Sequence, residues 1–188
     1  MIKELFSTLL LVAFKPEKGW RLIYNKYLEN PRYPVQETYY FPALGVLCLT
    51  AFVGELLNAP TFNILLAIKA AVLYLIIAML SYYAGFLGMA FVAKKWLGFT
   101  GSKTQWELFT FYAYSPIYLM TLVYLLVPQL RLLTILMLYS VYVVWQGVVY
   151  FWKFPEEKLF SSTIAFSVLL FLLAVGSKLV LSHLSFFS

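Results

Sequence analysis

Residues 62–93 read FNILLAIKAAVLYLIIAMLSYYAGFLGMAFVA, and Lys69 is the one charged residue in this stretch. An α-helix of about 20 apolar residues crosses the hydrocarbon core of a bilayer, which is roughly 30 Å thick. The stretch therefore predicts a membrane-spanning helix. It is longer than a straight span requires, so we expect the helix to tilt or to protrude from the bilayer.

The rest of the chain has the same apolar character. Of its 188 residues, 63% are hydrophobic and 12% are charged, whereas about a quarter of the residues in a soluble domain are charged. Five apolar stretches are long enough to span, and they lie at about Phe41–Asn58, Phe62–Ala93, Trp106–Val127, Leu132–Trp152 and Ser161–His183. We expect an all-α integral membrane protein in which residues 41–188 form a bundle of five transmembrane helices.

Residues 1–40 form a different segment, which we expect to be cytoplasmic and interfacial. Apolar residues recur at helical spacing up to Phe14, a run too short to cross a membrane: Ile2, Leu5, Phe6, Leu9, Leu10 and Ala13. This pattern predicts an amphipathic helix on the membrane surface. A signal peptide is the alternative, but KPEKGWRLIYNK follows in place of a small-residue cleavage site.

Basic residues outside the spans are distributed unequally between the two sides of the predicted bundle. On one side lies Arg131 alone. The other side has eleven basic residues: Lys3, Lys15, Lys18, Arg21, Lys26, Arg32, Lys94, Lys95, Lys103, Lys153 and Lys158. Because cytoplasmic loops are enriched in such residues, we predict a cytoplasmic N-terminus and an external C-terminus. Trp96, Trp106 and Trp152 fall near cytoplasmic span ends, where an aromatic belt is expected. Orientation in a bilayer thus explains the net charge of +6, and no nucleic-acid partner is expected.

Four ionisable residues fall within the predicted spans, where a charge costs roughly 2.5–3.5 kcal/mol on insertion scales. They are Glu55, Lys69, Glu107 and Lys178. Glu107 is one residue into its span and can reach the cytoplasmic interface, so we assign it no role. Glu55 and Lys69 lie at similar depth on either side of the turn at Pro60, and Lys178 lies at comparable depth in the fifth span. We expect Glu55 and Lys69 to pair, either to fix helix register or within a polar site that opens to the outer leaflet.

Polar and small residues form stripes along three predicted helices. The stripes comprise Tyr74, Ala78, Ser81, Gly85 and Gly88 in the second span, Tyr114, Tyr118 and Thr121 in the third, and Tyr139, Tyr142, Gln146 and Tyr150 in the fourth. Such stripes either pack helices closely together or line a hydrophilic cavity. Pro116 is expected to kink the third span and to free the carbonyl group of Tyr112, for which Ser115 or a tyrosine hydroxyl is the predicted donor.

The chain is poor in the residues that carry catalysis. It contains one histidine, His183, one cysteine, Cys48, and no aspartate. A Ser-His-Asp triad is therefore impossible, and most metal sites are excluded. We expect no enzymatic activity, no metal and no cofactor.

Three short motifs stand out along the chain: KPEKGW at 15–20, with Pro16 and Trp20; YAYSPI at 112–117; and VYVVWQGVVYF at 141–151, followed by Pro155 and Lys158. Together they resemble the Yip (Ypt-interacting protein) domain family in its short bacterial form. The resemblance covers nearly the whole chain, and five spans with a cytoplasmic N-terminus are similar to the family's arrangement. It implies a compact five-helix membrane domain, which we place in a bacterial inner membrane.

Eukaryotic members of this family bind Rab-type GTPases and each other, and help to organise vesicle membranes. That role rests partly on a long cytoplasmic N-terminal region and on an Asp-Leu-Tyr-Gly-Pro motif. This chain has only about 40 residues before its first span and reads TYYFPAL at 38–44. Binding to Rab-type GTPases is therefore not expected.

Two main hypotheses of function follow. In the first, the protein associates in the bilayer with itself or with another membrane protein. In the second, it is a small transporter, channel or lipid-translocating protein that uses Glu55, Lys69 and Lys178 together with the tyrosine stripes. An intramembrane enzyme that acts on lipids is a third hypothesis.

Overall fold

The computed structural model describes residues 2–60 and 62–182, and their side chains apart from those of 2, 131–134 and 177–182. These residues are mostly helical, and no strand occurs among them. The α-helices are α1 (Ile2–Phe14), α2 (Pro16–Glu29), α3 (Phe41–Asn58), α4 (Ile64–Val92), α5 (Lys103–Ala113), α6 (Ser115–Leu126), α7 (Ser140–Gly147) and α8 (Glu156–Ser182). Three π-helical turns lie at Gln36–Tyr40, Ala93–Leu97 and Val148–Trp152, and a 3-10 helix covers Pro128–Tyr139.

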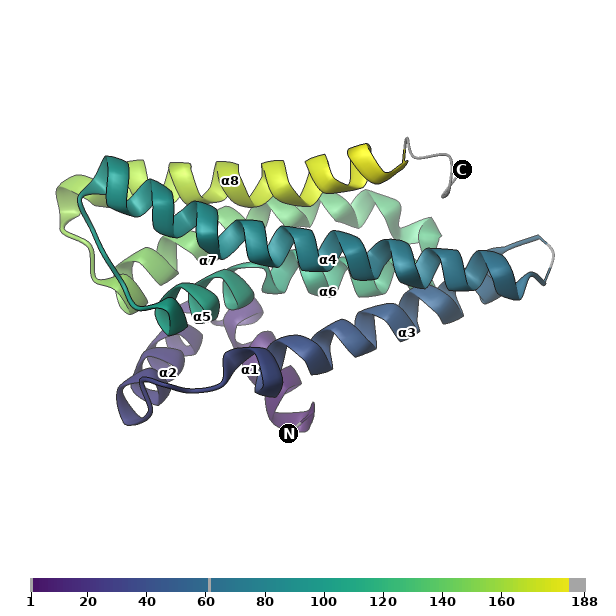
Figure 1. The fold of residues 1–188 in the computed structure, drawn as a ribbon, viewed down its shortest axis with the longest axis horizontal. Coiled ribbons are helices and arrows are strands. Elements are labelled where there is room, and N and C mark those ends of the chain that lie inside the picture. Colours follow the sequence, from purple (N-terminus) through teal and green to yellow (C-terminus); the bar gives the residue numbers. More distant parts are fainter. Residues whose placement is uncertain (1, 61, 183–188) are drawn as a thin grey trace.

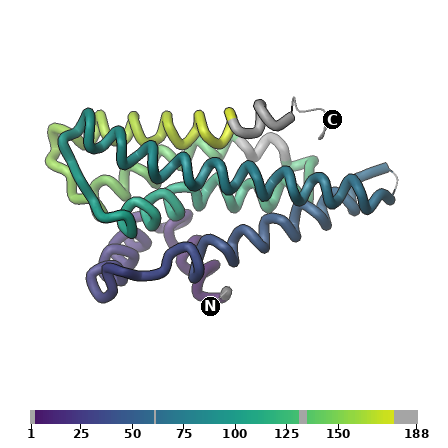
Figure 2. The backbone as a smooth tube through the Cα atoms, in the orientation of Figure 1, coloured from purple at the N-terminus to yellow at the C-terminus, as the bar shows by residue number. Residues whose placement is uncertain are grey.

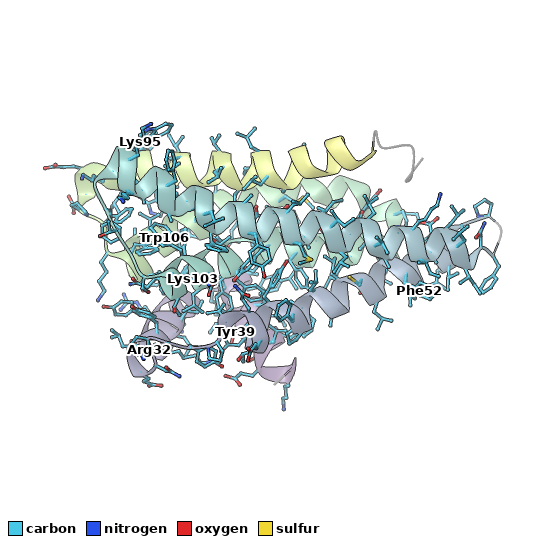
Figure 3. All side chains as sticks on the ribbon, viewed as in Figure 1. Arg32, Tyr39, Phe52, Lys95, Lys103 and Trp106 are labelled. Carbon is cyan, nitrogen blue, oxygen red and sulfur yellow. The ribbon has the colours of Figure 1, made fainter. Side chains whose placement is uncertain are left out.

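The long helices run side by side in one elongated bundle (Figure 1, Figure 2). Helix α4 packs against both α3 and α8, and α6 packs against α3. The hairpin of α3 and α4 extends beyond the end of α8 (Figure 1). Figure 3 shows Arg32, Lys95 and Lys103 toward one end of the bundle and Phe52 toward the other, which agrees with the predicted segregation of basic residues.

The predicted spans correspond to helices whose ends differ by a few residues. Four segments are long and apolar enough to cross a membrane: Gln36–Asn58, Ile64–Leu97, Ile135–Trp152 and Glu156–Gly176. Helices α5 and α6 make a fifth if the bent pair is one span. The second span is longer than predicted because the π-helical turn Ala93–Leu97 continues α4. The described residues therefore confirm a multi-pass membrane protein with four to five spans.

Helices α5 and α6 meet at a bend of 42°, where the sequence predicted a kink. Pro116 is the second residue of α6, and the break lies at Tyr114. Because proline has no N–H to donate, the carbonyl group of Tyr112 loses its usual helical partner. The backbone N–H of Tyr114 donates to the carbonyl of Thr110 at 3.2 Å, which is the last helical hydrogen bond before the bend. The expected role of Ser115 is wrong, since its buried hydroxyl has no partner in the described part of the chain.

The N-terminal region folds as two helices, of which the sequence predicted only the first. Helix α1 has the expected amphipathic pattern, with Leu5, Leu9 and Val12 buried. It packs against α2 and α6, so protein rather than a membrane surface covers this apolar face. The unpredicted α2 begins at Pro16, because a first helical position does not need the missing N–H.

Trp20 on α2 joins the N-terminal helices to the bundle. Its side chain is fully buried, and its Nε1 donates a hydrogen bond to the backbone carbonyl of Val143 in α7 at 2.8 Å. The indole centroid lies 5.2 Å from the ring centroid of Phe109 and 5.6 Å from that of Phe151. A Cβ atom at Gly147 would lie 2.7 Å from both Phe109 and Trp20, so glycine makes room there for the indole.

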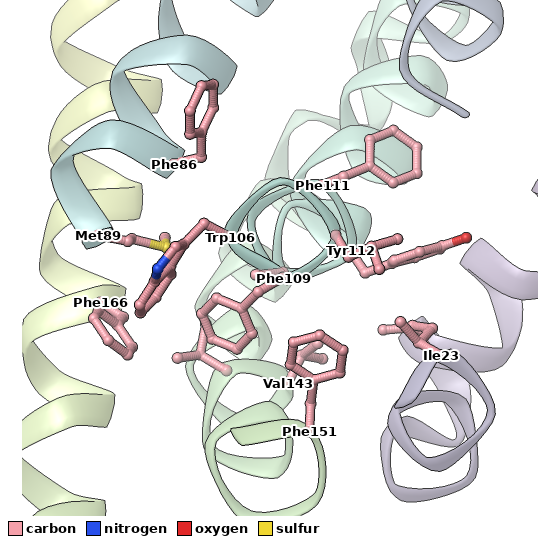
Figure 4. Close-up of a cluster of buried hydrophobic side chains, with 14 of the residues drawn as sticks. Ile23, Phe86, Met89, Trp106, Phe109, Phe111, Tyr112, Val143, Phe151 and Phe166 are labelled. Carbon is pink, nitrogen blue, oxygen red and sulfur yellow. The ribbon is translucent and has the colours of Figure 1, made fainter. Parts of the chain in front are cut away.

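An aromatic cluster fills the core around α5 (Figure 4). The ring centroid of Phe109 lies 5.6 Å from that of Phe166 in α8. Trp106 and Trp152 pack with centroids 4.1 Å apart and are 3% and 5% exposed. The predicted aromatic belt is therefore wrong for these two residues, because their large apolar rings are buried between helices. Trp96, at 70% exposed, does lie on the surface.

Candidate functional site

The predicted ion pair lies on the hairpin of α3 and α4. Glu55 is in the last turn of α3, Lys69 is near the start of α4, and both residues are half-buried. The two helices pack along each other, and the pairing of these charges stays a prediction. The third charge, Lys178, lies outside the residues whose side chains the structure describes.

The end of the same hairpin carries large apolar side chains that the fold leaves exposed. Leu57, Phe62 and Leu65 are 70%, 75% and 63% exposed, and Ile64 and Ile68 are exposed as well. Only 11% of the most apolar part of Ile64–Leu97 is buried within the protein. This projecting segment, residues 57–68 apart from Thr61, is called the hairpin end below.

A cavity of about 500 Å³ lies inside the bundle, between α3, α4, α6 and α8. Its walls include members of two predicted stripes: Tyr74, Ala78, Ser81, Tyr114, Tyr118 and Thr121. Glu55 and Lys69 do not contribute to these walls. The structure thus brings the stripes of the second and third spans together, and the two described charges are not among the residues that line this cavity.

The stripe of the fourth span does not reach the cavity. Tyr139 and Tyr142 are 38% and 48% exposed on the outside of the bundle, with ring centroids 5.5 Å apart. Tyr150 lies at the other end of this segment, where the guanidinium of Arg21 stacks over its ring at 4.5 Å. Gln146 is half-buried and is not among the cavity walls. Of the predicted polar site, Tyr142 and Gln146 therefore lie outside the cavity walls, because α7 packs mainly against α8 and α2.

Glu107 belongs to a buried polar network that the sequence analysis missed. The residue is 6% exposed, and Gln36 donates a hydrogen bond from Nε2 to its carboxylate at 2.8 Å. The Oε1 atom of Gln36 accepts from the hydroxyl of Tyr83 at 3.2 Å, and Nζ of Lys103 lies 3.5 Å from the carboxylate. The prediction that Glu107 reaches the interface is wrong, because these neighbours enclose it. One feature of the sequence could have indicated a partner for Glu107: Lys103 lies one helical turn before it, at the spacing of a salt bridge within a helix.

Removal of the Glu107 carboxylate should destabilise the protein. In Glu107→Leu the half-buried amide of Gln36 loses its acceptor, and the loss of such a partner costs up to about 1–3 kcal/mol of the free energy of unfolding. Glu107→Gln keeps an acceptor and should cost less. SDS titration of the purified protein measures both, with the exposed Glu156→Leu as the control. Equal losses in the leucine and glutamine variants would contradict a role for this hydrogen bond.

The sequence model of the Yip1 domain matches residues 10–177. The chain belongs to the Yip1 domain family. Neither a curated protein nor a solved structure gives a match. The resemblance to the Yip family drawn from three motifs is thereby confirmed over residues 10–177, whereas the short bacterial form stays a prediction.

The three motifs of this Yip1 domain meet around one side chain. Trp20 comes from KPEKGW, and Tyr112, from YAYSPI, has its ring centroid 6.4 Å from the indole. The third motif supplies the carbonyl of Val143, the ring of Phe151 and Gly147, whose lack of a side chain leaves room for the indole. The residues by which the chain resembles the family therefore form one packing site between α2, α5 and α7.

Proposed function

We propose that this Yip1-domain protein is a non-enzymatic membrane protein that acts by association, and that the hairpin end binds a second copy of the chain. The observation that carries the proposal is the uncovered apolar surface of the hairpin end. This surface belongs to the part of the bundle that projects beyond α8 (Figure 1).

The length of the second span supports the proposal. Ile64–Leu97 has 34 residues, which is about 51 Å of helix, against a hydrocarbon core of roughly 30 Å. Such an excess is accommodated by tilting or by oligomerisation. If the hairpin end leaves the core, its apolar side chains face water, where large exposed patches mark interaction sites.

If the hairpin end stays within the core, a second copy can cover its apolar side chains as well. Two-fold dimers, in which each copy offers the same surface to the other, are the commonest closed assemblies. We place the chain in a bacterial inner membrane, as the resemblance to the short bacterial form implies. The eleven-to-one distribution of basic residues supports a cytoplasmic N-terminus.

Transport through the charged residues has less support. Glu55 and Lys69 do not line the cavity, and among the described residues none that lines it is charged. A pathway for ions or polar solutes needs polar groups along its length.

Cysteine crosslinking in native membranes tests the association. Cys48 is the one cysteine, so Cys48→Ala gives a background on which Phe62→Cys marks the hairpin end. Leu172→Cys on α8, with a similar exposure of 64%, is the matched control. We expect an oxidant to give covalent dimers with cysteine at 62 and few at 172. Equal yields at the two positions, or none at 62, would contradict the proposed surface.

A further inference from the structure

We infer that the cavity between α3, α4, α6 and α8 binds one hydrocarbon chain of a lipid. The volume of about 500 Å³ falls within the range of small-molecule sites, which is about 300–1,000 Å³. The inference concerns the interior of the bundle, and it does not depend on the proposed contact between hairpin ends.

The walls are apolar except for hydroxyl groups. Among the aliphatic and aromatic contributors are Leu44, Leu47, Ile77, Ile117 and Phe171. No charged side chain takes part in the lining formed by the described residues. A phosphate or an ammonium head group inside the cavity would therefore find no counter-charge among the described residues, and burial of an unpaired charge is costly.

Some hydroxyl groups of the walls are engaged with the backbone, whereas those of Tyr40 and Tyr82 are buried without a partner among the described residues. Tyr118 donates to the carbonyl of Ala43 in α3 at 2.8 Å, and the Tyr114 hydroxyl lies 3.4 Å from the carbonyl oxygen of Ser81 in α4. These two bonds hold neighbouring helices together, as hydroxyl groups do in membrane bundles. Thr121 donates to the carbonyl of Ile117 at 2.7 Å within α6.

Apart from the hydroxyls of Tyr40 and Tyr82, the remaining surface is apolar and suits a chain better than several waters. A buried water requires two to four polar partners, and apolar cavities stay dry and take up apolar molecules. The bilayer around the bundle supplies such molecules as acyl chains at high concentration. A flexible chain gains apolar contact along the whole cavity, while its head group can stay at the membrane interface.

Photocrosslinking of the full chain in liposomes tests the site. The probe is phosphatidylcholine with a diazirine in one acyl chain, and adducts are mapped by peptide mass spectrometry. We expect adducts on Leu47 and Ile117, which are only 6% and 9% exposed and therefore out of reach of lipid outside the bundle. Leu172 on the outer surface, at 64% exposed, reports ordinary lipid contact.

A pair of alanine substitutions on α4 provides the control. Ala78 lines the cavity, whereas Ala84 is exposed. Ala78→Phe should fill the space and reduce adducts on Leu47 and Ile117 by about fivefold or more, while Ala84→Phe leaves them unchanged. Adducts on Leu172 should be the same in both. If Ala78→Phe does not fold, Ala174→Phe fills the cavity from α8.

The absence of interior adducts in the wild-type protein would overturn the inference, and this result needs no variant. Interior adducts that persist in a folded, cavity-filled variant would overturn it too. A second arm uses a diazirine fatty acid in place of the phospholipid. Interior adducts from either probe uphold a hydrocarbon-chain site. The ratio of the adduct yield from phosphatidylcholine to the yield from the fatty acid shows which of the two supplies the chain.

Discussion

Trp20→Ala is expected to lower the free energy of unfolding by about 3–5 kcal/mol, the range for loss of a large buried aromatic side chain. The substitution removes a fully buried indole, its contacts with Phe109 and Phe151, and its hydrogen bond to the carbonyl of Val143. Helix α2 should loosen from the bundle together with α1, which packs against it, because Trp20 supplies contacts of α2 with α5 and α7. SDS titration measures the loss, and limited proteolysis within α2 reports the loosening.

Trp96→Ala is the matched control for this prediction. Trp96 is 70% exposed, and surface substitutions usually change stability by less than about 0.5 kcal/mol. If the two tryptophan variants were equally stable and equally resistant to protease, the N-terminal helices would not belong to the core.

Gly54→Ala should weaken the contact between α3 and α6. A Cβ atom at position 54 would collide with the backbone carbonyl oxygen of Leu125 and lie 2.9 Å from its carbonyl carbon. Asn58 joins the same helices, since its Nδ2 donates to the carbonyl of Gly54 at 2.7 Å and lies 3.4 Å from that of Leu125. Because backbone atoms cannot rotate away, the helices must separate, and overpacking of this kind costs about 1–3 kcal/mol.

Gly45→Ala on the same helix is the control, because it makes the same change in helix propensity without the collision. A Cβ atom at position 45 would meet no atom within 4 Å. Alanine is favoured over glycine within a helix by about 0.5–1 kcal/mol, so this variant should be neutral or more stable. The same SDS titration compares the two glycines. A Gly54→Ala protein as stable as Gly45→Ala would contradict the close approach of α3 and α6.

The membrane fold could be predicted from the sequence because its signal is local. A run such as residues 62–93 has to form a helix in a bilayer whatever its neighbours are. The bend near Pro116 was equally predictable, since the missing N–H belongs to the residue itself. The motif around Trp20 helped to identify the family. The structural role of this tryptophan is visible only in the fold, which places Gly147 and Val143 beside the indole.

The parts that sequence reasoning missed depend on contacts between distant segments. Glu107 was expected at the interface because its place in the span is near an end, but Gln36 and Tyr83 enclose it. Trp106 and Trp152 had the position of belt residues, and only their mutual packing shows that they lie inside. The tyrosine stripes were recognisable, but which of them share a cavity depends on how α7 is rotated relative to α4 and α6.

The measurement that tests the central claim most directly is the number of copies per assembly in a lipid bilayer. Single-molecule photobleaching of the fluorescently labelled protein in liposomes, at high dilution, counts the subunits without detergent. Association through the hairpin end predicts two bleaching steps for the wild-type protein. It also predicts one step for a variant in which charged residues replace Phe62 and Leu65, two exposed side chains of the hairpin end. A single step for the wild-type protein would contradict the account.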